Sequence, residues 1–318
     1  AVGLPRDAIE QLLYHRQRLD LDAELARLDR EGVTLLTLDD PADPRLLKEI
    51  ELPPPLLYMR GDIGPADEFA VAIVGTRKVT PYGSEVAQRL ASGLAENGVT
   101  VVSGLALGID ALAHQAALDA GGRTLAVQGC GLDRVYPERH RALAKEIVGS
   151  GALLSTYPWG TPVDPTNFPP RNRVISGLSL GVIVVEAGER SGALITLRYA
   201  LEQGRETFAV PGNVFSRLSV GTNRAIQKGE AKLVTSAQDV LEELHLTQAS
   251  EQQEVRAFIP ESVEERRVLD CLSAEPVPID EIVRQSQLPT AVVTGTLVML
   301  ELKGAVLRAD QASFMLAR

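Results

Sequence analysis

The segment FPPRNRVISGLS, residues 168–179, places two arginines where they could bind an anion. Arg171 and Arg173 flank Asn172, directly after two prolines and at the head of an apolar helical pattern. Proline fixes φ and favours an extended residue before it, so the approach to this helix is conformationally restricted. Free N–H groups at a helix N-terminus and a guanidinium fork together suit a phosphate. The segment therefore predicts a phosphate site, with a surface salt bridge at a helix start as the alternative.

Glycine-rich loops follow four strand-like apolar runs and could bring backbone amides close to a phosphate. These loops are GTRKVTPYG at 75–83, GLALGIDALAH at 104–114, GCGLDRVYP at 129–137 and AGERSGALIT at 187–196. In open parallel sheets, ligands bind beyond the carboxyl ends of the strands, where these loops are expected. The first loop also carries Arg77 and Lys78. We expect these two cations to meet Arg171 and Arg173 over one crevice, unless each loop is simply a tight strand-to-helix turn.

Signatures of nucleotide-dependent or acid–base enzymes are weak. GxGxxG does not follow the first apolar run and GxxxxGK[ST] does not occur, which argues against a dinucleotide or ATP enzyme. Asp110 and Glu186 stand at strand ends, and His114 follows Asp110 by four residues. Acid–base chemistry would need these groups to converge. We favour structural roles instead, with Asp110 as a partner of a helix N-terminus, Glu186 as a carboxylate bonded to backbone N–H groups and His114 as a packing residue.

Alternating apolar runs and helical patterns predict a doubly wound, mainly parallel α/β sheet of the Rossmann-like kind. The runs span residues 71–74, 99–103, 124–128, 152–156, 182–186 and 207–210. Most of the stretches between them are amphipathic and end on glycine, as helices commonly do. We therefore expect a Rossmann-like domain over residues 61–245.

The flanks of this domain have different patterns. Residues 7–30 show a helical pattern, residues 33–38 a strand, and a proline-rich connector follows. We expect a small helical N-terminal region with its connector over residues 1–60, and a polar linker over residues 246–260. Residues 261–318 then show three helical segments and two short strands, which is the outline of a winged helix.

Charge is unevenly distributed along the chain. The formal net charge is −10, yet residues 71–235 contain 17 Lys and Arg against 13 Asp and Glu. Nucleic-acid affinity comes largely from Lys and Arg at phosphates, so a basic domain between acidic flanks is compatible with it, although the excess is modest. Residues 251–318 contain 7 basic against 11 acidic residues. Because the last helical segment nearly lacks cations, we expect the tail to contact protein or to pack, and not to read duplex DNA.

Other features point to an ordinary cytoplasmic protein. No apolar run is long enough for a membrane span, and the first residues include acids where a signal peptide is apolar. Cys130 and Cys271 fall in different predicted domains, which argues against a disulfide. Four scattered histidines and the lack of CxxC argue against a metal site, and no cofactor is expected. We interpret Trp159, in a proline-rich loop, as a loop anchor, with base stacking as the alternative.

Six ordered motifs make the chain resemble the DprA/Smf family of DNA-processing proteins. They are VGTRKVTPYG, SGLALGIDALAH, GCGLDRVYP, FPPRNRVISGLS, VVEAGERSGALIT and VPGNVFSRLSVGTNRAIQKGEA, within residues 52–244. The tail resembles the winged helix that many members carry, and the first part resembles a shortened form of their helical N-terminal domain. The resemblance implies a non-enzymatic protein that binds single-stranded DNA, forms a homodimer through the Rossmann-like domain and loads the recombinase RecA, in natural transformation and possible DNA repair.

The resemblance also implies the roles of ten residues. Those implied to hold phosphates are Arg77, Lys78, Arg171 and Arg173. Those implied to shape the pocket are Gly75, Thr76, Ser103, Gly104, Asn172 and Ser176.

A second family has a similar fold, the lysine-decarboxylase-like nucleoside-monophosphate phosphoribohydrolases, which carry the motif PGGxGTxxE. The chain contains Pro211, Gly212, Gly221 and Thr222, but eight residues separate Gly212 from Gly221. No glutamate follows Gly221-Thr222 at the motif spacing. An enzyme of this kind is therefore the weaker alternative.

Overall fold

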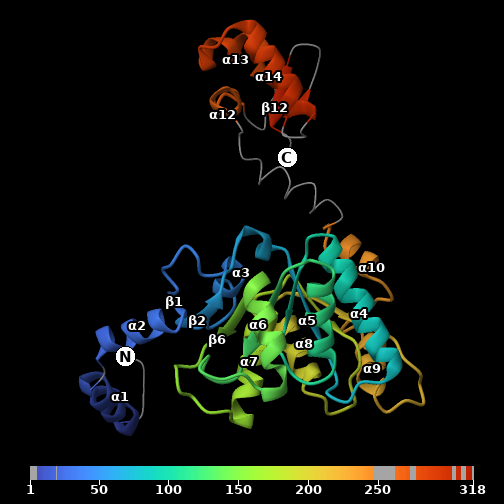
Figure 1. The fold of residues 1–318 in the computed structure, drawn as a ribbon. Helices are drawn as coiled ribbons and strands as arrows, with labels where there is room; N and C mark the ends of the chain where they lie inside the picture. Colours follow the sequence, from blue (N-terminus) through green and yellow to red (C-terminus); the bar gives the residue numbers. More distant parts are fainter. Residues whose placement is uncertain are drawn as a thin grey trace. The chain divides into compact units, whose positions relative to one another are not determined.

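The computed structural model describes residues 6–18, 20–246, 262–272, 277–302, 306–308 and 313–316. The chain divides into two compact units, Ala1–Val240 and Leu241–Arg318 (Figure 1). Cys130 and Cys271 are free thiols in different units, in agreement with the sequence. Within the described residues, every helix falls short of the length and apolar character that crossing a membrane requires.

The first unit is built on a nine-stranded sheet with the order β1-β2-β6-β5-β4-β3-β7-β8-β9. From β1 to β9, the strands span Thr34–Thr37, Leu56–Gly61, Ala70–Val74, Thr100–Ser103, Thr124–Gln128, Gly151–Ser155, Gly181–Val184, Glu206–Ala209 and Lys232–Leu233. The six strands expected from the apolar runs are β3 to β8, and all of them pair in parallel. The prediction of a doubly wound, mainly parallel α/β sheet is therefore confirmed.

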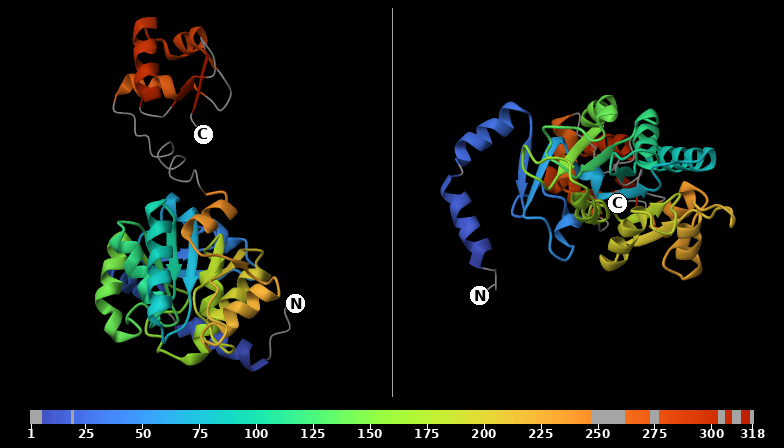
Figure 2. Two further views of the ribbon diagram at one scale, coloured as in Figure 1. Left: turned by 90° about the vertical axis from the view of Figure 1, so that its right-hand side faces the viewer. Right: turned by 90° about the horizontal axis from the view of Figure 1, so that it is seen from below.

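Helices cover both faces of this sheet. They are α4 Pro81–Glu96, α5 Ile109–Asp119, α6 Arg141–Ser150, α7 Phe168–Gly177, α8 Ala193–Glu202 and α9 Val220–Gln227, with short 3-10 helices η1 Pro65–Glu68, η2 Glu138–His140 and η3 Pro165–Asn167. The helix α10 Ala237–Glu243 crosses the boundary between the two units. Successive residues of a strand point to opposite faces. Accordingly, Leu153 of β6 packs in one core cluster with Ile147 of α6, whereas Leu154 packs in another with Val174 of α7. The right-hand view of Figure 2 shows α6, in green, and α8, in yellow, on opposite sides of the strands.

The sheet begins earlier in the chain than the boundary expected near Gly61. β2 pairs antiparallel with β6, and β1 pairs antiparallel with β2. Leu57 and Met59 of β2 lie in the same core cluster as Leu154. The boundary near Gly61 therefore falls inside the sheet and has to move towards the N-terminus, to the start of β1. Three prolines just before β2 obscured a short apolar strand, because proline-dense sequence is typical of a connector.

The helical pattern of residues 7–30 consists of two helices, α1 Arg6–Arg18 and α2 Leu21–Arg30. Asp20 has an extended backbone, and its side chain accepts a hydrogen bond of 3.0 Å from the backbone N–H of Ala23. This is an N-cap, so a new helix begins after Asp20 and the helical pattern of residues 7–30 is divided into two helices. The short helix of the connector is α3 Arg45–Lys48.

The second unit has the outline of a winged helix, as expected for residues 261–318. Its helices are α12 Val263–Leu269, α13 Ile279–Ser286 and α14 Thr290–Leu302, and its strands are β10 Val277–Pro278, β11 Val306–Arg308 and β12 Ser313–Leu316. The strand order is β10-β12-β11. One apolar cluster joins Val268, Ile282, Leu297 and Phe314, so the unit has its own core. The linker expected over residues 246–260 lies, apart from Leu246, outside the described residues.

Leu57→Ala is expected to lower the free energy of unfolding by about 3 kcal/mol, because it empties a packed position of the core. Leu57 is 1% exposed, whereas Leu56, the preceding residue of β2, is 37% exposed. The matched control Leu56→Ala should therefore cost less than about 1 kcal/mol. Urea denaturation followed by circular dichroism measures both. Equal losses would contradict the inclusion of β2 in the core.

Candidate functional site

The candidate site lies where the winding of the sheet reverses. From β3 the chain passes to β4 on one side, and later to β7 on the other side of β3. Loops at the carboxyl ends of these strands diverge, which leaves a crevice. A cavity of about 430 Å³ occupies this position. Its walls come from the loops after β3, β4 and β7 and from α7, and include Gly75, Thr76, Arg77, Asp110, Phe168, Arg171, Asn172 and Gly192.

An aromatic pair lies beside this cavity. The rings of Tyr136 and Phe168 are stacked, with centroids 5.7 Å apart and an interplanar angle of 26°. The guanidinium carbon of the exposed Arg77 lies 5.4 Å from the centroid of the Phe168 ring. Tyr136 is 43% exposed, and all three residues line a smaller cavity of about 40 Å³. The surface thus offers a cation for a phosphate next to a ring on which a planar group can stack.

Tyr136 and Phe168 were missed as functional candidates in the sequence. Both occur in motifs that the sequence singled out for other reasons, VYP and FPP. A signal was available, because aromatic residues are rare, at 4% of the chain, and these two stand directly before proline in motifs that the sequence had already singled out. Their stacking, however, depends on a contact between segments that are far apart in the sequence.

Arg171 is a buried structural residue, 5% exposed, and not a freely presented fork. Its Nη1 donates to the carbonyl of Gly104 at 2.6 Å and to the carbonyl of Val127, and its Nε donates to Asn172 Oδ1 at 3.2 Å. Burial lowers the pKa of the guanidinium, and the charge of Asp110 opposes this effect. Glycine at position 104 leaves room for this arrangement, because a Cβ there would lie 2.8 Å from the guanidinium and would displace it from its carbonyl partners. Arg171 therefore ties the carboxyl ends of β4 and β5 to α7.

The N-terminus of α7 is also a poorer anion site than the sequence indicated. Its first three residues are Phe168, Pro169 and Pro170. The N–H groups at the start of a helix have no partner within the helix, and they are what binds an anion there. Proline has no N–H, so two of these donors are missing. The prolines position α7 but do not contribute to binding a phosphate.

Side chains hold the backbone of the loop after β4 at residues 104–106. Asp110 accepts hydrogen bonds from the backbone N–H groups of Gly104, at 3.2 Å, and Ala106, at 3.4 Å. Leu105 between them has a φ of 55°, which is unusual for a residue with a side chain. Its carbonyl accepts from His140 Nδ1 at 2.8 Å. Burial raises the pKa of Asp110, and Arg171 and the two N–H groups oppose that effect. The structural interpretation of Asp110 is confirmed.

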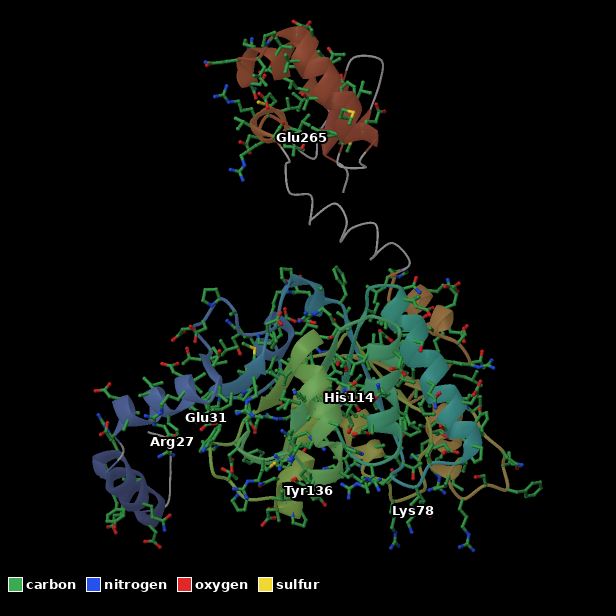
Figure 3. All side chains as sticks on the ribbon, viewed as in Figure 1. Arg27, Glu31, Lys78, His114, Tyr136 and Glu265 are labelled. Carbon is green, nitrogen blue, oxygen red and sulfur yellow. The ribbon has the colours of Figure 1, made fainter. Side chains whose placement is uncertain are left out.

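His114 is a satisfied core residue in one defined tautomer. The hydroxyl of Thr124 donates to the carbonyl of Val101 at 2.6 Å, so it accepts from Nδ1 of His114, also at 2.6 Å. Nε2 then accepts from the backbone N–H of Leu105 at 3.3 Å. Burial lowers the pKa of His114 to about 3, with contributions from the nearby His140 and Arg171. Figure 3 shows His114 in the interior of the domain.

Glu186 does not join Asp110 and His114. Its two oxygens accept from the N–H of Thr80, at 3.1 Å, and from the hydroxyl of Thr80, at 2.6 Å. It lines a separate cavity of about 500 Å³, together with Tyr82. Its structural role is confirmed, and the three groups do not converge as acid–base chemistry requires.

Arg173 does not join the crevice that the sequence predicted. Its Nη1 donates to the carbonyl of Glu51 in the connector, at 2.9 Å. Residues two apart on a helix point in nearly opposite directions, so Arg171 and Arg173 cannot serve the same side of α7. Lys78 is exposed and does not line the cavity, but it lies at the same end of the domain as Tyr136 (Figure 3). Of the four predicted cations, Arg77 and Arg171 meet over the crevice.

The predicted pocket-shaping residues fall into two groups. Those that line a cavity are Gly75, Thr76 and Asn172, and Gly104 lines the smaller one. Ser103 and Ser176 are fully buried instead. Ser103 Oγ donates to the carbonyl of Ile73 at 2.6 Å, and Ser176 Oγ donates to the carbonyl of Arg173 at 3.1 Å. These two hydroxyls stabilise the backbone and do not face the site.

Two further interpretations of the sequence can be resolved. Trp159 packs against the core cluster near β6, and the guanidinium of Arg60 lies 5.8 Å from its ring, so it anchors a loop. In the segment that resembles a phosphoribohydrolase motif, the backbone of Gly212 and the side chain of Asn223 exchange two hydrogen bonds, of 3.0 and 2.9 Å. The backbone N–H and carbonyl of Gly212 are therefore engaged within the fold. That alternative therefore gains no support from the geometry.

Comparison with known proteins gives consistent matches. The family model of DNA recombination-mediator protein A matches residues 34–245, and that of the DprA winged helix domain matches residues 252–311. Protein Smf of Synechocystis sp. is 34% identical, over 96% of this chain and 85% of the relative. The first match begins at β1, in agreement with the sheet.

Two solved structures are similar to this chain. The X-ray structure of DprA from Streptococcus pneumoniae has a TM-score of 0.68 at 42% identity, over 76% of this chain and 83% of that one. DprA from Helicobacter pylori, whose structure was determined for its single-stranded DNA binding mode, has a TM-score of 0.61 at 33% identity. That match covers 67% of this chain and 95% of the other.

Arg171→Ala is expected to lower the free energy of unfolding by about 3 kcal/mol or more, because it leaves the buried carbonyls of Gly104 and Val127 without this donor and removes a charge that favours ionised Asp110. Arg173→Ala is the matched control and removes a hydrogen bond to the carbonyl of Glu51. It should cost about 1 kcal/mol. Chemical denaturation of both variants measures the difference, and an Arg171→Ala protein as stable as the wild type would refute the structural role.

Stability is expected to fall at acidic pH through His114. Its pKa of about 3 lies below the ordinary 6.5, so the unfolded chain binds the proton first as pH falls. The free energy of unfolding should therefore decrease by up to about 1.4 kcal/mol per pH unit below about pH 6.5, and be unaffected by this residue above it. His114→Gln should show a shallower loss between about pH 6.5 and 4.5 in urea denaturation. Parallel pH profiles would exclude His114 as the source.

Proposed function

The chain belongs to the DprA/Smf family, and we propose that it is a single-strand DNA-binding mediator of recombination. The observation that carries this proposal is the exposed Arg77 beside the stacked rings of Tyr136 and Phe168. These residues lie at the crevice where the winding of the sheet reverses, here called the switch-point crevice. A phosphate and an unpaired base are the two parts of a single strand that such a surface can bind. The H. pylori relative, at 33% identity, supports the same ligand.

Phosphate binding is assigned to Arg77 and Lys78. Both are exposed, and among the described residues neither takes part in an ion pair, so their charge is available. Gly75 and Gly192 line the crevice next to them and leave room for a backbone to approach. Arg171 adds positive potential from below the surface without giving up its carbonyl partners. Contacts of this kind are independent of sequence and depend steeply on salt.

Stacking on Tyr136 provides the preference for single strands. In a duplex the faces of the bases are already stacked on one another, whereas an unpaired base can cover an exposed ring. Stacking accepts every base, so sequence preference should be weak. The protein would therefore recognise the DNA backbone and the faces of the bases, and would make no contacts with the base edges.

The remaining parts of the proposal rest on family membership. We assign to the chain a homodimer formed through its Rossmann-like domain and the delivery of the bound strand to RecA in the cytoplasm, in transformation or repair. A non-enzymatic role is supported by Asp110, His114 and Glu186, each of which is bonded within the fold. The winged helix is assigned to protein contact, because α14 contains no Lys or Arg and exposes Val298 and Met299.

Arg77→Ala/Lys78→Ala is expected to weaken binding of a labelled single-stranded oligonucleotide by at least about tenfold and to reduce the salt slope by about one to two. Tyr136→Ala should weaken binding by about 1 to 3 kcal/mol without changing the salt slope, because stacking releases no counterions. Fluorescence anisotropy at several salt concentrations, with single-stranded and duplex probes, measures both effects.

Lys145→Ala/Arg198→Ala is the matched control, since it removes the same charge from exposed positions of α6 and α8. It should change the affinity by less than about threefold. An equal loss in the control, or an affinity of the wild type that does not vary with salt, would contradict the proposed phosphate site.

A further inference from the structure

A further cavity lies at the opposite edge of the sheet from the proposed DNA site. Its volume is about 240 Å³. It is formed at the amino ends of the strands, by the loop before α3, by η1, by the start of β5 and by the residue after α7. Figure 1 labels α3 at this end of the domain, whereas Figure 3, in the same view, labels Lys78 and Tyr136 at the other. The walls are largely apolar and include Pro41, Pro44, Leu46, Ile63, Pro65, Leu125 and Leu178.

Asp43 is an unmatched carboxylate in the wall of this cavity. It is 6% exposed, and its Oδ2 is completely enclosed without a hydrogen-bond partner. Among the described residues, neither oxygen of this carboxylate takes part in a recorded hydrogen bond or ion pair. The backbone N–H of Asp43 donates to the carbonyl of Asp40 at 3.1 Å, which fixes the residue in its loop. A buried charge without a partner is costly. Because Oδ2 is enclosed, a cation in the cavity would pair with Oδ1 and would offset the charge that the two oxygens share.

The charged neighbours of Asp43 are engaged elsewhere. Nζ of Lys48 donates to the carbonyl of Asp40 at 2.6 Å. Arg45 forms an ion pair of 2.8 Å with Glu49. Burial raises the pKa of Asp43, and the charge of Lys48 opposes this effect. These cations reduce the local negative potential but do not bind the Asp43 carboxylate.

Two other acidic residues line the cavity, but within the described part of the chain Asp43 is the one of the three that is both buried and without a partner. Asp67 is saturated, since it accepts from Thr100 Oγ1 at 2.7 Å and from Arg123 at 2.8 and 3.0 Å. Glu68 is exposed on the rim. The charge of Asp67 is therefore balanced by Arg123, which leaves Asp43 as the buried carboxylate that a ligand in the cavity can reach.

We propose that this cavity binds a primary ammonium group on an aliphatic chain, with Asp43 as its counter-ion. The apolar walls suit an alkyl body and disfavour a hydrated ion. A metal is a poor fit, because no group of three His, Cys, Asp or Glu among the described residues could hold one. A guanidinium binds best to both oxygens of a carboxylate, and it is disfavoured here because Oδ2 of Asp43 is enclosed. A compact ammonium needs only one oxygen. A free alkylamine and the side chain of a lysine share this chemistry.

The test is calorimetric titration of the full chain at neutral pH with 1-aminopentane, and with 1-pentanol as the uncharged probe. We expect the amine to bind the wild type at least about tenfold more tightly than it binds Asp43→Asn, and more tightly than the alcohol binds either protein. Glu68→Gln is the control for a general loss of negative charge and should keep the amine affinity within about twofold. Melting curves verify that Asp43→Asn is folded, and Asp43→Ser is used if it is not.

Several outcomes would overturn the proposal. These are equal amine affinities of the wild type and Asp43→Asn, a loss in Glu68→Gln as large as in Asp43→Asn, equal affinities for amine and alcohol, and no heat of binding for the amine.

A second titration, with Nα-acetyl-lysine N-methylamide, distinguishes a free alkylamine from a lysine side chain as the source of the ammonium group. Tighter binding of this compound than of 1-aminopentane supports a lysine of a partner protein, and the reverse supports a free amine. Binding of single-stranded DNA should be unchanged in Asp43→Asn, so this test stands independently of the DNA site.

Discussion

The buried guanidinium of Arg171 connects the elements that form the candidate site. It bonds to backbone carbonyls of Gly104 and Val127, which lie near the ends of two neighbouring strands, and it reaches them from a helix that begins on two prolines. Because α7 is held there, Phe168 at its first position faces Tyr136 and Arg77. Removal of the guanidinium would weaken the link between the start of α7, which carries Phe168, and the ends of β4 and β5.

Buried and exposed charges have separate roles in this domain. Asp110, His114 and Glu186 are enclosed and bonded to the loops of the carboxyl edge, where they hold backbone conformations that would otherwise be costly. Arg77 and Lys78 are exposed and can respond to a ligand. A rigid inner layer beneath exposed cations suits a surface that binds a flexible polymer, because the backbone that carries the binding groups is already positioned before the ligand arrives.

The two edges of the sheet present opposite chemistry. At the carboxyl edge, glycine loops, cations and aromatic rings surround the switch-point crevice. At the amino edge, Asp43 stands without a partner in an apolar cavity. The strands separate the two sites, so ligands of opposite charge could be bound by one domain without competing.

The sequence by itself determined the order of strands and helices, the parallel core and the winged helix, because apolar periodicity follows directly from burial on one or two faces. It also predicted which sheet edge carries the candidate site, since strand direction fixes where the loops gather. Only the tertiary structure decided that β2 belongs to the sheet, that Arg171 is buried and that Arg173 points to the connector. The stacking of Tyr136 on Phe168 was likewise decided there. The physical reason is that burial and pairing depend on contacts between distant segments, and a residue type does not specify which side of a helix meets which neighbour.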